Sequence, residues 1–257
     1  MNKEIVFRNT ANHIGRKILI TPENSLLTLM AVGRIILNKN TSTVEINTED
    51  REYSFICLHG NGRIISENNT AEVNPYDGIY VPRNTSVKIF TDNYLDLVEC
   101  SAPVSEKYTF AHVRFDEVKN DPKLHMSLGQ NSDRRELYTL IGDNVKGGRL
   151  FNGVTFSEKG NWTSWPPHQH TEFREEVYLY FDMPKPAFGI QMLYSGNGIP
   201  ENVIPVFDND AVVISGGYHP NVAIPGYSIN FVWMLCARRE IIDRAWGGSI
   251  VQPEFQK

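Results

Sequence analysis

The chain has 257 residues, of which 41% are hydrophobic and 21% are charged, and its formal net charge is -5. There is enough apolar side-chain material to bury a core, which excludes a disordered chain, and the mild acidity argues against a nucleic-acid partner. A length near 250 residues fits one large domain or two of about 120–130 residues. Nineteen glycines and fourteen prolines predict many turns and therefore favour β-structure.

Short β-prone segments separated by turn residues predict strands along most of the chain. In chain order these segments are Leu26–Val32, Ser42–Ile46, Tyr53–Leu58, Gly78–Val81, Ser86–Phe90, Leu95–Cys100, Leu150–Phe156, Glu176–Phe181, Phe188–Tyr194, Ala211–Ser215 and Ile229–Cys236. Between the two halves, His112–Leu140 is polar and charged, and we expect a helical or irregular connector there. Short strands at regular spacing are typical of a sandwich or barrel, so the sequence predicts an all-β protein.

A weak internal repeat divides the predicted strands into two sets. Asp77–Pro82 aligns with Asp210–Ser215, and each segment is followed by a short turn and another β-prone segment. Upstream of these segments, Glu52 aligns with Glu176. This order of strands and turns is the plan of a small double-sheet jelly-roll barrel, so the repeat predicts two barrels in tandem.

One group of histidines stands above the background of this sequence. His168 and His170 are two residues apart, and residues i and i+2 of a strand point to the same side. Glu176 opens the next apolar strand, and His219 follows 43 residues later in a Gly-Gly-Tyr-His-Pro turn. Three imidazoles and one carboxylate suit one divalent ion, with one or two positions open for water or substrate. Zinc is the preferred ion, and iron, manganese and nickel also suit this ligand set.

The carboxylate of this group has two candidates. Glu175 and Glu176 are adjacent, so the alternation of a strand lets only one of them point toward the histidines. Glu176 is preferred because it is in register with the start of the repeated strand, and Glu175 stays as the alternative.

The first repeat lacks the corresponding ligands. The four ligand positions fall there on Val44, Ile46, Glu52 and Ser86, three of which cannot serve. We therefore expect residues 1–145, connector included, to form a barrel without metal ligands. Residues 146–257 are expected to form the metal-binding barrel.

The segment Gly160–His170, with the sequence GNWTSWPPHQH, closely resembles the segment before the metal ligands of the 5-deoxy-glucuronate isomerases of inositol catabolism. Further matches follow in the same order over nearly the whole chain, at Tyr80–Pro82, Cys100–Pro103, Arg134–Glu136, Gly216–Pro220 and Gly226–Tyr227. The family is a bicupin, so the resemblance implies a tandem cupin fold of two double-stranded β-helix jelly-roll barrels. It also implies a metal site at His168, His170, Glu176 and His219.

The chain departs from that family at one place. Only five residues separate His170 from Glu176, where the inositol-pathway members usually carry a longer insertion. The short form looks more like the sister family, the 5-keto-4-deoxyuronate isomerases of pectin breakdown.

The resemblance implies a metal-dependent aldose–ketose isomerase that converts 5-deoxy-D-glucuronate to 5-dehydro-2-deoxy-D-gluconate. Isomerisation of 5-keto-4-deoxyuronate is the alternative reaction, and both act on a small deoxy uronate. An iron-dependent cupin dioxygenase with the same ligands is a second hypothesis. A non-catalytic sugar-binding cupin is a third.

Further catalytic candidates face the inside of the same barrel. Tyr178 and Tyr180 share the parity of Glu176 on its strand, so all three are expected to line one cavity. Gln191 lies on the following strand, where a buried amide is suited to orient a hydroxyl of the substrate. No residue is assigned as the general base.

Three arginines lie in segments from which they could reach the carboxylate of the uronate. Arg174, in the loop before the strand of Glu176, is a candidate partner of the carboxylate. For Arg134 and Arg135 in the connector, a salt bridge between the barrels is favoured over a substrate clamp.

The sequence also predicts where the protein works. Its N-terminal segment lacks the apolar core of a signal peptide, and its apolar stretches of about seven residues are far shorter than the roughly 20 needed to span a bilayer. Cys57, Cys100 and Cys236 lie in apolar segments at no metal-binding spacing and are expected to be buried, inert thiols. We therefore expect a soluble cytoplasmic protein without a membrane partner. Cupins often pair through exposed sheet edges, which favours a homo-oligomer.

Overall fold

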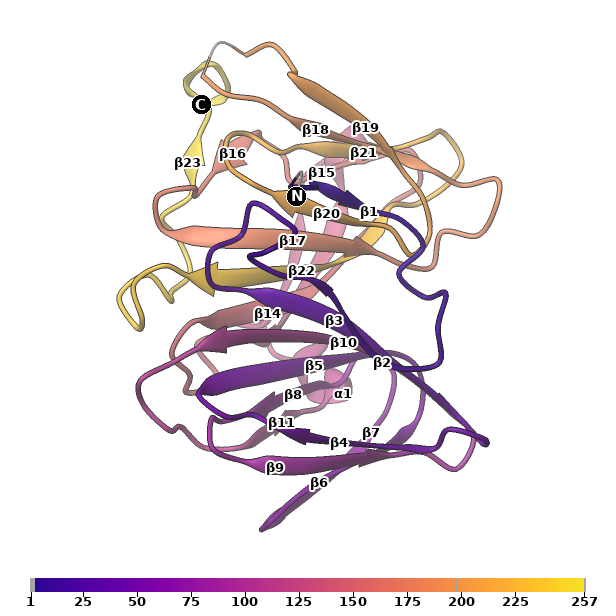
Figure 1. Cartoon of the computed structure of the whole chain (residues 1–257). Helices are drawn as coiled ribbons and strands as arrows, with labels where there is room; N and C mark the ends of the chain where they lie inside the picture. The colour runs from indigo at the N-terminus through magenta and orange to yellow at the C-terminus, as the bar shows by residue number, and fades with distance from the viewer. Residues whose placement is uncertain (1–2, 197, 257) are drawn as a thin grey trace.

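The computed structural model describes residues 3–196 and 198–256, and these form two antiparallel barrels stacked one on the other (Figure 1). The first barrel pairs a six-stranded sheet, in the order β11-β8-β5-β10-β3-β2, with a four-stranded sheet, β4-β9-β6-β7. Its strands are β2 (Gly15–Ile20), β3 (Ala31–Asn38), β4 (Thr43–Asn47), β5 (Arg51–Gly60), β6 (Gly62–Ser66), β7 (Asn69–Val73), β8 (Gly78–Val81), β9 (Ser86–Phe90), β10 (Tyr94–Pro103) and β11 (Ala111–Val113).

The second barrel pairs a seven-stranded sheet, in the order β1-β20-β17-β22-β14-β13-β12, with a four-stranded sheet, β15-β21-β18-β19. A separate ribbon joins β16 to β23. These strands are β1 (Val6–Phe7), β12 (His125–Leu128), β13 (Arg135–Ile141), β14 (Leu150–Ser157), β15 (Trp162–Thr163), β16 (His168–Gln169), β17 (Arg174–Tyr180), β18 (Gly189–Leu193), β19 (Asn202–Val206), β20 (Ala211–Ile214), β21 (Asn221–Ala223), β22 (Asn230–Ala237) and β23 (Ile250–Val251). The all-β fold of two barrels predicted from the repeat is therefore confirmed.

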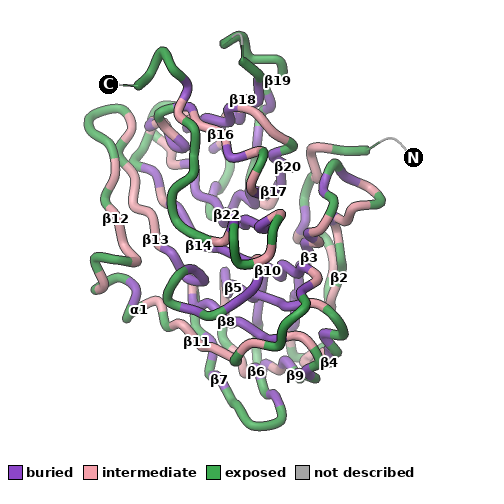
Figure 2. Tube along the Cα trace, turned by 90° about the vertical axis from the view of Figure 1, so that its left-hand side faces the viewer, coloured by how far each residue is buried: buried purple, intermediate pink, exposed green. Residues whose placement is uncertain are grey.

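The large sheets are buried on both faces, which explains why their strands read as continuous apolar runs. On β22, Phe231 and Trp233 point into the second barrel, whereas Val232 and Met234 point toward the first barrel. The outward residues of both large sheets form one shared core, to which Val98 of β10 also belongs. In Figure 2 the central strands are accordingly buried, while the strands and loops at the margin are exposed or intermediate. This packing fixes the second barrel against the first.

The repeated aspartates have a local structural role that explains the repeat. The carboxylate of Asp77 accepts a hydrogen bond from the backbone N–H of Asn74 at 3.0 Å, and that of Asp210 accepts one from Phe207, also at 3.0 Å. Each aspartate thus closes a turn from three residues downstream and leads the chain directly into β8 or β20. The same turn occurs at the same place in both barrels.

The predicted alignment of Glu52 with Glu176 is wrong by one residue. Tyr53 pairs with Val81 at the end of β8, and Glu176 pairs with Ile214 at the end of β20, so Tyr53 is the counterpart of Glu176. Glu52 corresponds instead to Glu175. A shift of one residue exchanges the two faces of a strand, so the predicted equivalence joined residues that point in opposite directions.

The expected connector is also different from the prediction. The only α-helix among the described residues, α1 (Phe115–Val118), lies in it, together with the 3₁₀ turn at Asn131–Asp133. The rest of the segment forms β12 and β13, which pair with each other. Strand β13 also pairs with β14. The polar residues there belong to a strand pair with one face toward the barrel interior and one toward solvent. The first predicted strand, Leu26–Val32, is also displaced, because the observed strand β3 begins only at Ala31.

Two other expectations can be compared with the structure. Cys57, Cys100 and Cys236 are buried free thiols, and burial raises the pKa of each. In the described part of the chain, no helix has the length and apolar character that a membrane crossing requires.

Candidate metal centre and its cavity

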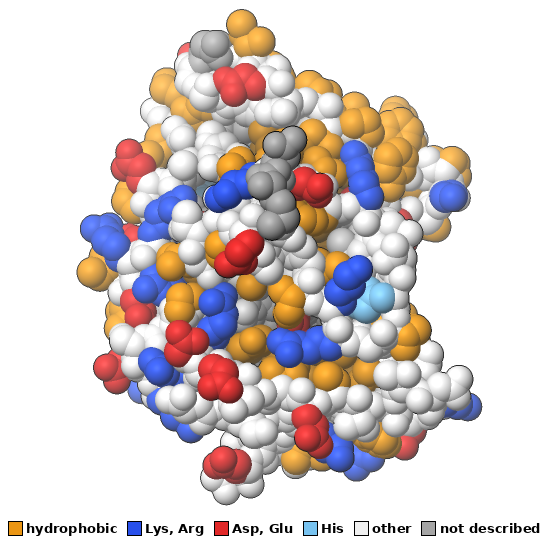
Figure 3. Space-filling view, in the orientation of Figure 1, with side chains coloured by type: hydrophobic (Ala, Val, Ile, Leu, Met, Phe, Trp, Pro, Cys, Tyr) orange, Lys and Arg blue, Asp and Glu red, His pale blue; other side chains and the backbone are white. Residues whose placement is uncertain are grey.

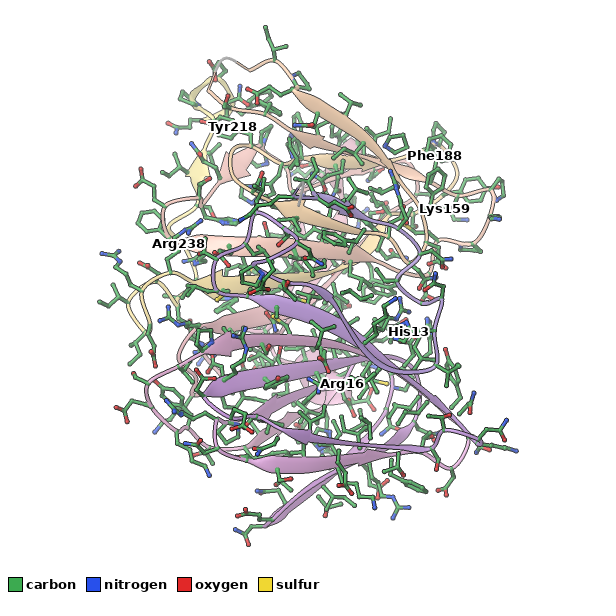
Figure 4. All side chains as sticks on the ribbon, in the orientation of Figure 1. His13, Arg16, Lys159, Phe188, Tyr218 and Arg238 are labelled. Carbon is green, nitrogen blue, oxygen red and sulfur yellow. The ribbon has the colours of Figure 1, made fainter. Side chains whose placement is uncertain are left out.

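Three of the predicted ligands meet at one end of the second barrel. His168 lies on β16, His170 follows that strand, and His219 lies in the turn after β20. One ring nitrogen from each histidine lies within 4.8 Å of the others, so the three can hold a metal ion. In Figure 4 Tyr218, the neighbour of His219, marks this end of the barrel together with Arg238, while Phe188 and Lys159 lie at the other end.

The turn that carries His219 depends on two glycines. Gly217 has a φ of 77°, in the left-handed region, and a Cβ there would lie 2.3 Å from the carbonyl oxygen of Tyr194. Gly216 is similarly restricted, because a Cβ would lie 2.8 Å from the side chain of Thr171. Only glycine allows this close approach, which brings His219 beside His168 and His170.

The two adjacent glutamates point in opposite directions. Oε2 of Glu176 lies 3.0 Å from Nε2 of His170 and 3.2 Å from Nε2 of His219. Glu175 instead accepts hydrogen bonds from the backbone N–H groups of Thr28, Leu29 and Met30 in the first barrel. Glu176 is therefore the carboxylate that accompanies the histidines.

The hydrogen bonds of the histidines leave nitrogen lone pairs facing the centre of the group. Nδ1 of His168 lies 3.0 Å from the carbonyl oxygen of Pro166, and Nδ1 of His219 lies 3.0 Å from that of Gly217. A carbonyl only accepts, so Nδ1 donates in both rings and Nε2 carries no proton. Such backbone acceptors are the usual partners of metal-binding histidines.

Nε2 of His219, which is itself an acceptor, therefore faces the acceptor oxygen of Glu176. It is buried and makes no hydrogen bond with a described residue, although the carboxylate of Glu176 is 3.2 Å away. Burial lowers the pKa of His219 to about 3, and burial also lowers the pKa of His168, so these imidazoles are neutral at pH 7. Burial acts to raise the pKa of Glu176, but the neighbouring His170 and His219 outweigh it and the pKa is lowered. A carboxylate and a neutral nitrogen lone pair at this distance repel each other unless a cation lies between them, so the residues fit a metal ion.

A cavity of about 200 Å³ opens beside this group. Its wall is built from alternate residues of the seven-stranded sheet, because every second side chain of a strand points inward. The lining includes Arg135 and Leu137 of β13, Glu176 and Tyr178 of β17, and Phe231, Trp233 and Leu235 of β22. His168, His170 and Ser164 also belong to its polar part. The space suits a small organic molecule with both polar and apolar surface.

The three predicted catalytic side chains occupy different places. Tyr178 lines the cavity, and its hydroxyl lies 2.8 Å from Oγ of Ser164. Tyr180 and Gln191 are fully buried and are absent from the described cavity wall. Tyr180 donates a hydrogen bond of 2.6 Å to Gln191 Oε1, and Gln191 Nε2 donates one of 2.8 Å to the carbonyl oxygen of His219. Gln191 is thus placed to hold the backbone of His219, and Tyr180 contacts the amide oxygen of Gln191.

The arginines are arranged differently from the expectation. Arg134 is exposed and pairs with Glu158 at 3.4 Å. Arg135 instead turns into the cavity, where its side chain is 10% exposed. Arg174 also lines the cavity but donates hydrogen bonds to backbone carbonyls of the segment 243–247.

Two tryptophans, Trp233 of β22 and Trp246 in the segment that follows, supply apolar surface to the site. Both line the cavity, and their rings lie 5.8 Å apart. Gly153 on β14 makes room for Trp233, because a Cβ there would lie 2.3 Å from the indole ring. Trp246 comes from the segment after β22, which carries no strand pattern, so its position had no signal in the sequence.

The same fold occurs in solved structures. A solved IolB-like protein from Salmonella typhimurium superposes with a TM-score of 0.86, at 18% identity and 98% coverage of both chains. A mutant oxalate decarboxylase from Bacillus subtilis superposes with a TM-score of 0.68, at 10% identity, over 98% of this chain and 80% of the other. Two stacked barrels with one histidine group define this protein as a tandem cupin.

The family follows from sequence comparison. The KduI/IolB family profile matches residues 6–253, so the chain belongs to the KduI/IolB family. It is 25% identical over 245 residues to a 5-deoxy-glucuronate isomerase of Geobacillus thermodenitrificans, covering 88% of this chain and 87% of that protein. It is 31% identical over 240 residues to a 4-deoxy-L-threo-5-hexosulose-uronate ketol-isomerase of Enterococcus faecalis, covering 88% and 80%.

Proposed function

We propose that this protein is a metal-dependent aldose–ketose isomerase of a deoxy uronate, with His168, His170, Glu176 and His219 as metal ligands. The observation that carries the proposal is the contact of two acceptors, Nε2 of His219 and the carboxylate of Glu176, inside a group of three imidazoles. The isomerase names of the relatives in both branches of the family support the reaction class.

The reaction moves a proton from C2 to C1 of the sugar and a second proton from O2 to O1. A metal ion held by the four ligands would supply a Lewis acid for the carbonyl oxygen. Burial raises the pKa of Tyr178 well above its ordinary value, so its hydroxyl keeps its proton and can donate to an oxygen of the substrate. Phe231 and Leu235 line the same cavity and exclude water from the reacting carbons.

For the substrate, we propose 5-deoxy-D-glucuronate, as in inositol catabolism, because the segment Gly160–His170 resembles that branch of the family. The short spacing between His170 and Glu176 favours the second candidate, 4-deoxy-L-threo-5-hexosulose-uronate, and so does the 31% identity to the ketol-isomerase. Both are six-carbon uronates with a carbonyl group and a carboxylate. We propose zinc as the resident ion, with iron, manganese and nickel to be compared.

The test is a direct assay of both uronates. The purified protein would be stripped with a chelator, reloaded separately with zinc, iron, manganese or nickel, and incubated with each substrate without oxygen. We expect one uronate to be isomerised, the stripped protein to be inactive, and a His168→Ala/His219→Ala variant to stay folded but inactive.

Other outcomes would identify the competing functions. Oxygen consumption with iron alone would indicate the cupin dioxygenase. Binding of a uronate without turnover would indicate the non-catalytic sugar-binding cupin. Isomerisation by the verified metal-free double variant would overturn the proposed mechanism. The native mass of the protein, measured in the same preparation, would test the expected homo-oligomer.

A further inference from the structure

Arg135 is a cation inside the cavity, and the metal centre does not use it. It lies on β13, which is separated from the strand of Glu176 by β22 and β14, yet it lines the same cavity. The guanidinium therefore lies on another wall of the same small space as the histidines.

The guanidinium of Arg135 is held in place by two hydrogen bonds, and its other N–H donors remain free of acceptors among the described residues. Nη1 of Arg135 donates a hydrogen bond of 2.7 Å to the carbonyl oxygen of Asp133, and Nη2 donates one of 2.5 Å to that of Trp165. A guanidinium has five N–H donors, so three, including Nε–H, have no acceptor among the described residues. Two backbone carbonyls thus fix the orientation of the group and leave donors free for a ligand.

No described carboxylate neutralises Arg135 at hydrogen-bond distance. Oδ2 of Asp133 is 3.8 Å from Nη1, and its Oδ1 already accepts a hydrogen bond from the backbone N–H of Gln130. Burial lowers the pKa of Arg135 despite Asp133 and Tyr178, which act in the opposite direction. A buried cation is stable only when an anion meets it, so this side of the cavity is complementary to a negatively charged ligand.

Arg174, the other arginine of the cavity, has a different role. Its Nε donates to the carbonyl oxygen of Asp243, and its Nη2 donates to those of Ala245 and Gly247. These bonds use one edge of the guanidinium and tie the segment that carries Trp246 to the barrel. Arg174 thus spends three N–H donors, Nε–H among them, on the wall of the cavity, whereas Arg135 spends two and keeps Nε–H for a ligand.

We infer that Arg135 is the residue that binds the carboxylate of the substrate; this inference rests on the proposed function. In a hexuronate the carboxylate is C6 and the aldehyde is C1, at the two ends of the carbon chain. Binding of C6 at Arg135 directs the other end of the molecule toward the histidine group. On the face of the molecule shown in Figure 3, charged side chains of both signs are scattered. The substrate class is then a six-carbon uronate and not the corresponding neutral aldose.

The experiment measures binding without turnover. Metal-loaded wild-type protein and the variants R135Q, R135K and R134Q would be titrated calorimetrically with D-glucuronate and with D-glucose. Arg134 is the matched control, because it is adjacent, loses the same charge and is 59% exposed beside Glu158. We expect R135Q to bind glucuronate about 10- to 100-fold more weakly, as for loss of a charge-assisted hydrogen bond. Glucose binding by R135Q and glucuronate binding by R134Q should be unchanged, and R135K should lie between wild type and R135Q.

The outcomes separate this inference from the proposed function. Isomerisation of a uronate by wild type, with equal glucuronate affinity in R135Q and R134Q, would overturn the role of Arg135 and leave the proposed function standing. Glucuronate binding that depends on Arg135, without isomerisation, would overturn the function and leave the anion site. An equal loss of glucuronate and glucose binding in R135Q, or unfolding of both R135Q and R135K, would mean that Arg135 is structural, and the inference would fail.

Discussion

Glu52 and Glu175 occupy equivalent places in the two barrels, and each binds the backbone of the other barrel. Glu52 accepts hydrogen bonds from the N–H groups of residues 148, 149 and 150, at the start of β14. Glu175 accepts them from residues 28, 29 and 30, just before β3. The exchange is reciprocal, so it relates the barrels by an approximate twofold symmetry. It also explains why Glu175 is unavailable to the histidines.

Replacement of the two adjacent glutamates should therefore give opposite effects. E175Q should lower the free energy of unfolding by about 1.5–3 kcal/mol, because an amide cannot accept from the same backbone donors as a carboxylate does, and should keep its metal. E176Q should weaken metal binding by at least about 10- to 100-fold with a smaller effect on stability. Urea unfolding and metal analysis of both variants test this, and loss of metal from E175Q alone would contradict the assignment.

Gln191 should affect the metal through the backbone of His219. The variant Q191M removes the donor to that carbonyl, so we expect a metal affinity about 10- to 100-fold lower than in wild type. Y180F is the control, because it removes a hydroxyl on the far side of Gln191 and should change the metal affinity much less. A fall in kcat with unchanged metal affinity in Q191M would instead support the direct catalytic role predicted from the sequence.

The turn at Asp77 should contribute stability that depends on pH. Burial acts to raise the pKa of Asp77, but His112 and the backbone N–H groups of Phe115 and Asn74 outweigh it, and the pKa is lowered. A lowered pKa means stability that is present above the ordinary aspartate pKa, about 4, and lost as the pH falls through the folded value.

D77N should accordingly be less stable than wild type by about 1–3 kcal/mol at pH 7. The difference should shrink as the pH falls below about 4, where wild type loses the same charge. Urea unfolding of both proteins from pH 7 down to pH 3 measures it. A difference that stays constant over this range would show that the charge of Asp77 does not carry the effect.

Gly153 should be intolerant of a side chain because of Trp233. A Cβ at this position would lie 2.0 Å from the carbonyl oxygen of Tyr138 and 2.3 Å from the indole. G153A should lose about 1–3 kcal/mol of stability and bind glucuronate more weakly, since Trp233 must move into the cavity. G196A is the control, because a Cβ there meets nothing within 4 Å, and its stability should change by less than about 0.5 kcal/mol. Equal stability of the two variants would refute the packing argument.

Much of this architecture was predictable because it depends on short-range signals. The Asp-Gly and Asp-Ala turns at Asp77 and Asp210 set the repeat, and the repeat predicted the two barrels. The spacing of His168 and His170 predicted a shared face. His219 could be grouped with them because its turn follows the second repeated strand. Their meeting in space supports the ligand prediction, which only a metal measurement can test.

The errors came from longer-range relationships. The alternation of apolar residues does not show which residue of β5 is equivalent to which residue of β17. Glu52 was therefore aligned with Glu176, one residue away from its true counterpart, Glu175. The apolar run at Leu137–Ile141 has the composition of a strand, but the charged residues before it led to the prediction of a helical or irregular connector up to Leu140. Since the orientation of Arg135 depends on pairing of β13 with β14, its place in the cavity had no local signal.

Strand β1 pairs with a strand that lies far from it in the sequence. Val6 pairs with Val212 on β20, and the backbone N–H of Asn9 reaches the carboxylate of Asp210 across 201 residues of sequence. During translation this first strand has no partner until the ribosome has delivered β20. The sheet that carries Glu176 is therefore completed only near the end of synthesis, and contacts of such long range are formed slowly. An edge strand that waits this long for its partner is exposed to pairing with other nascent chains.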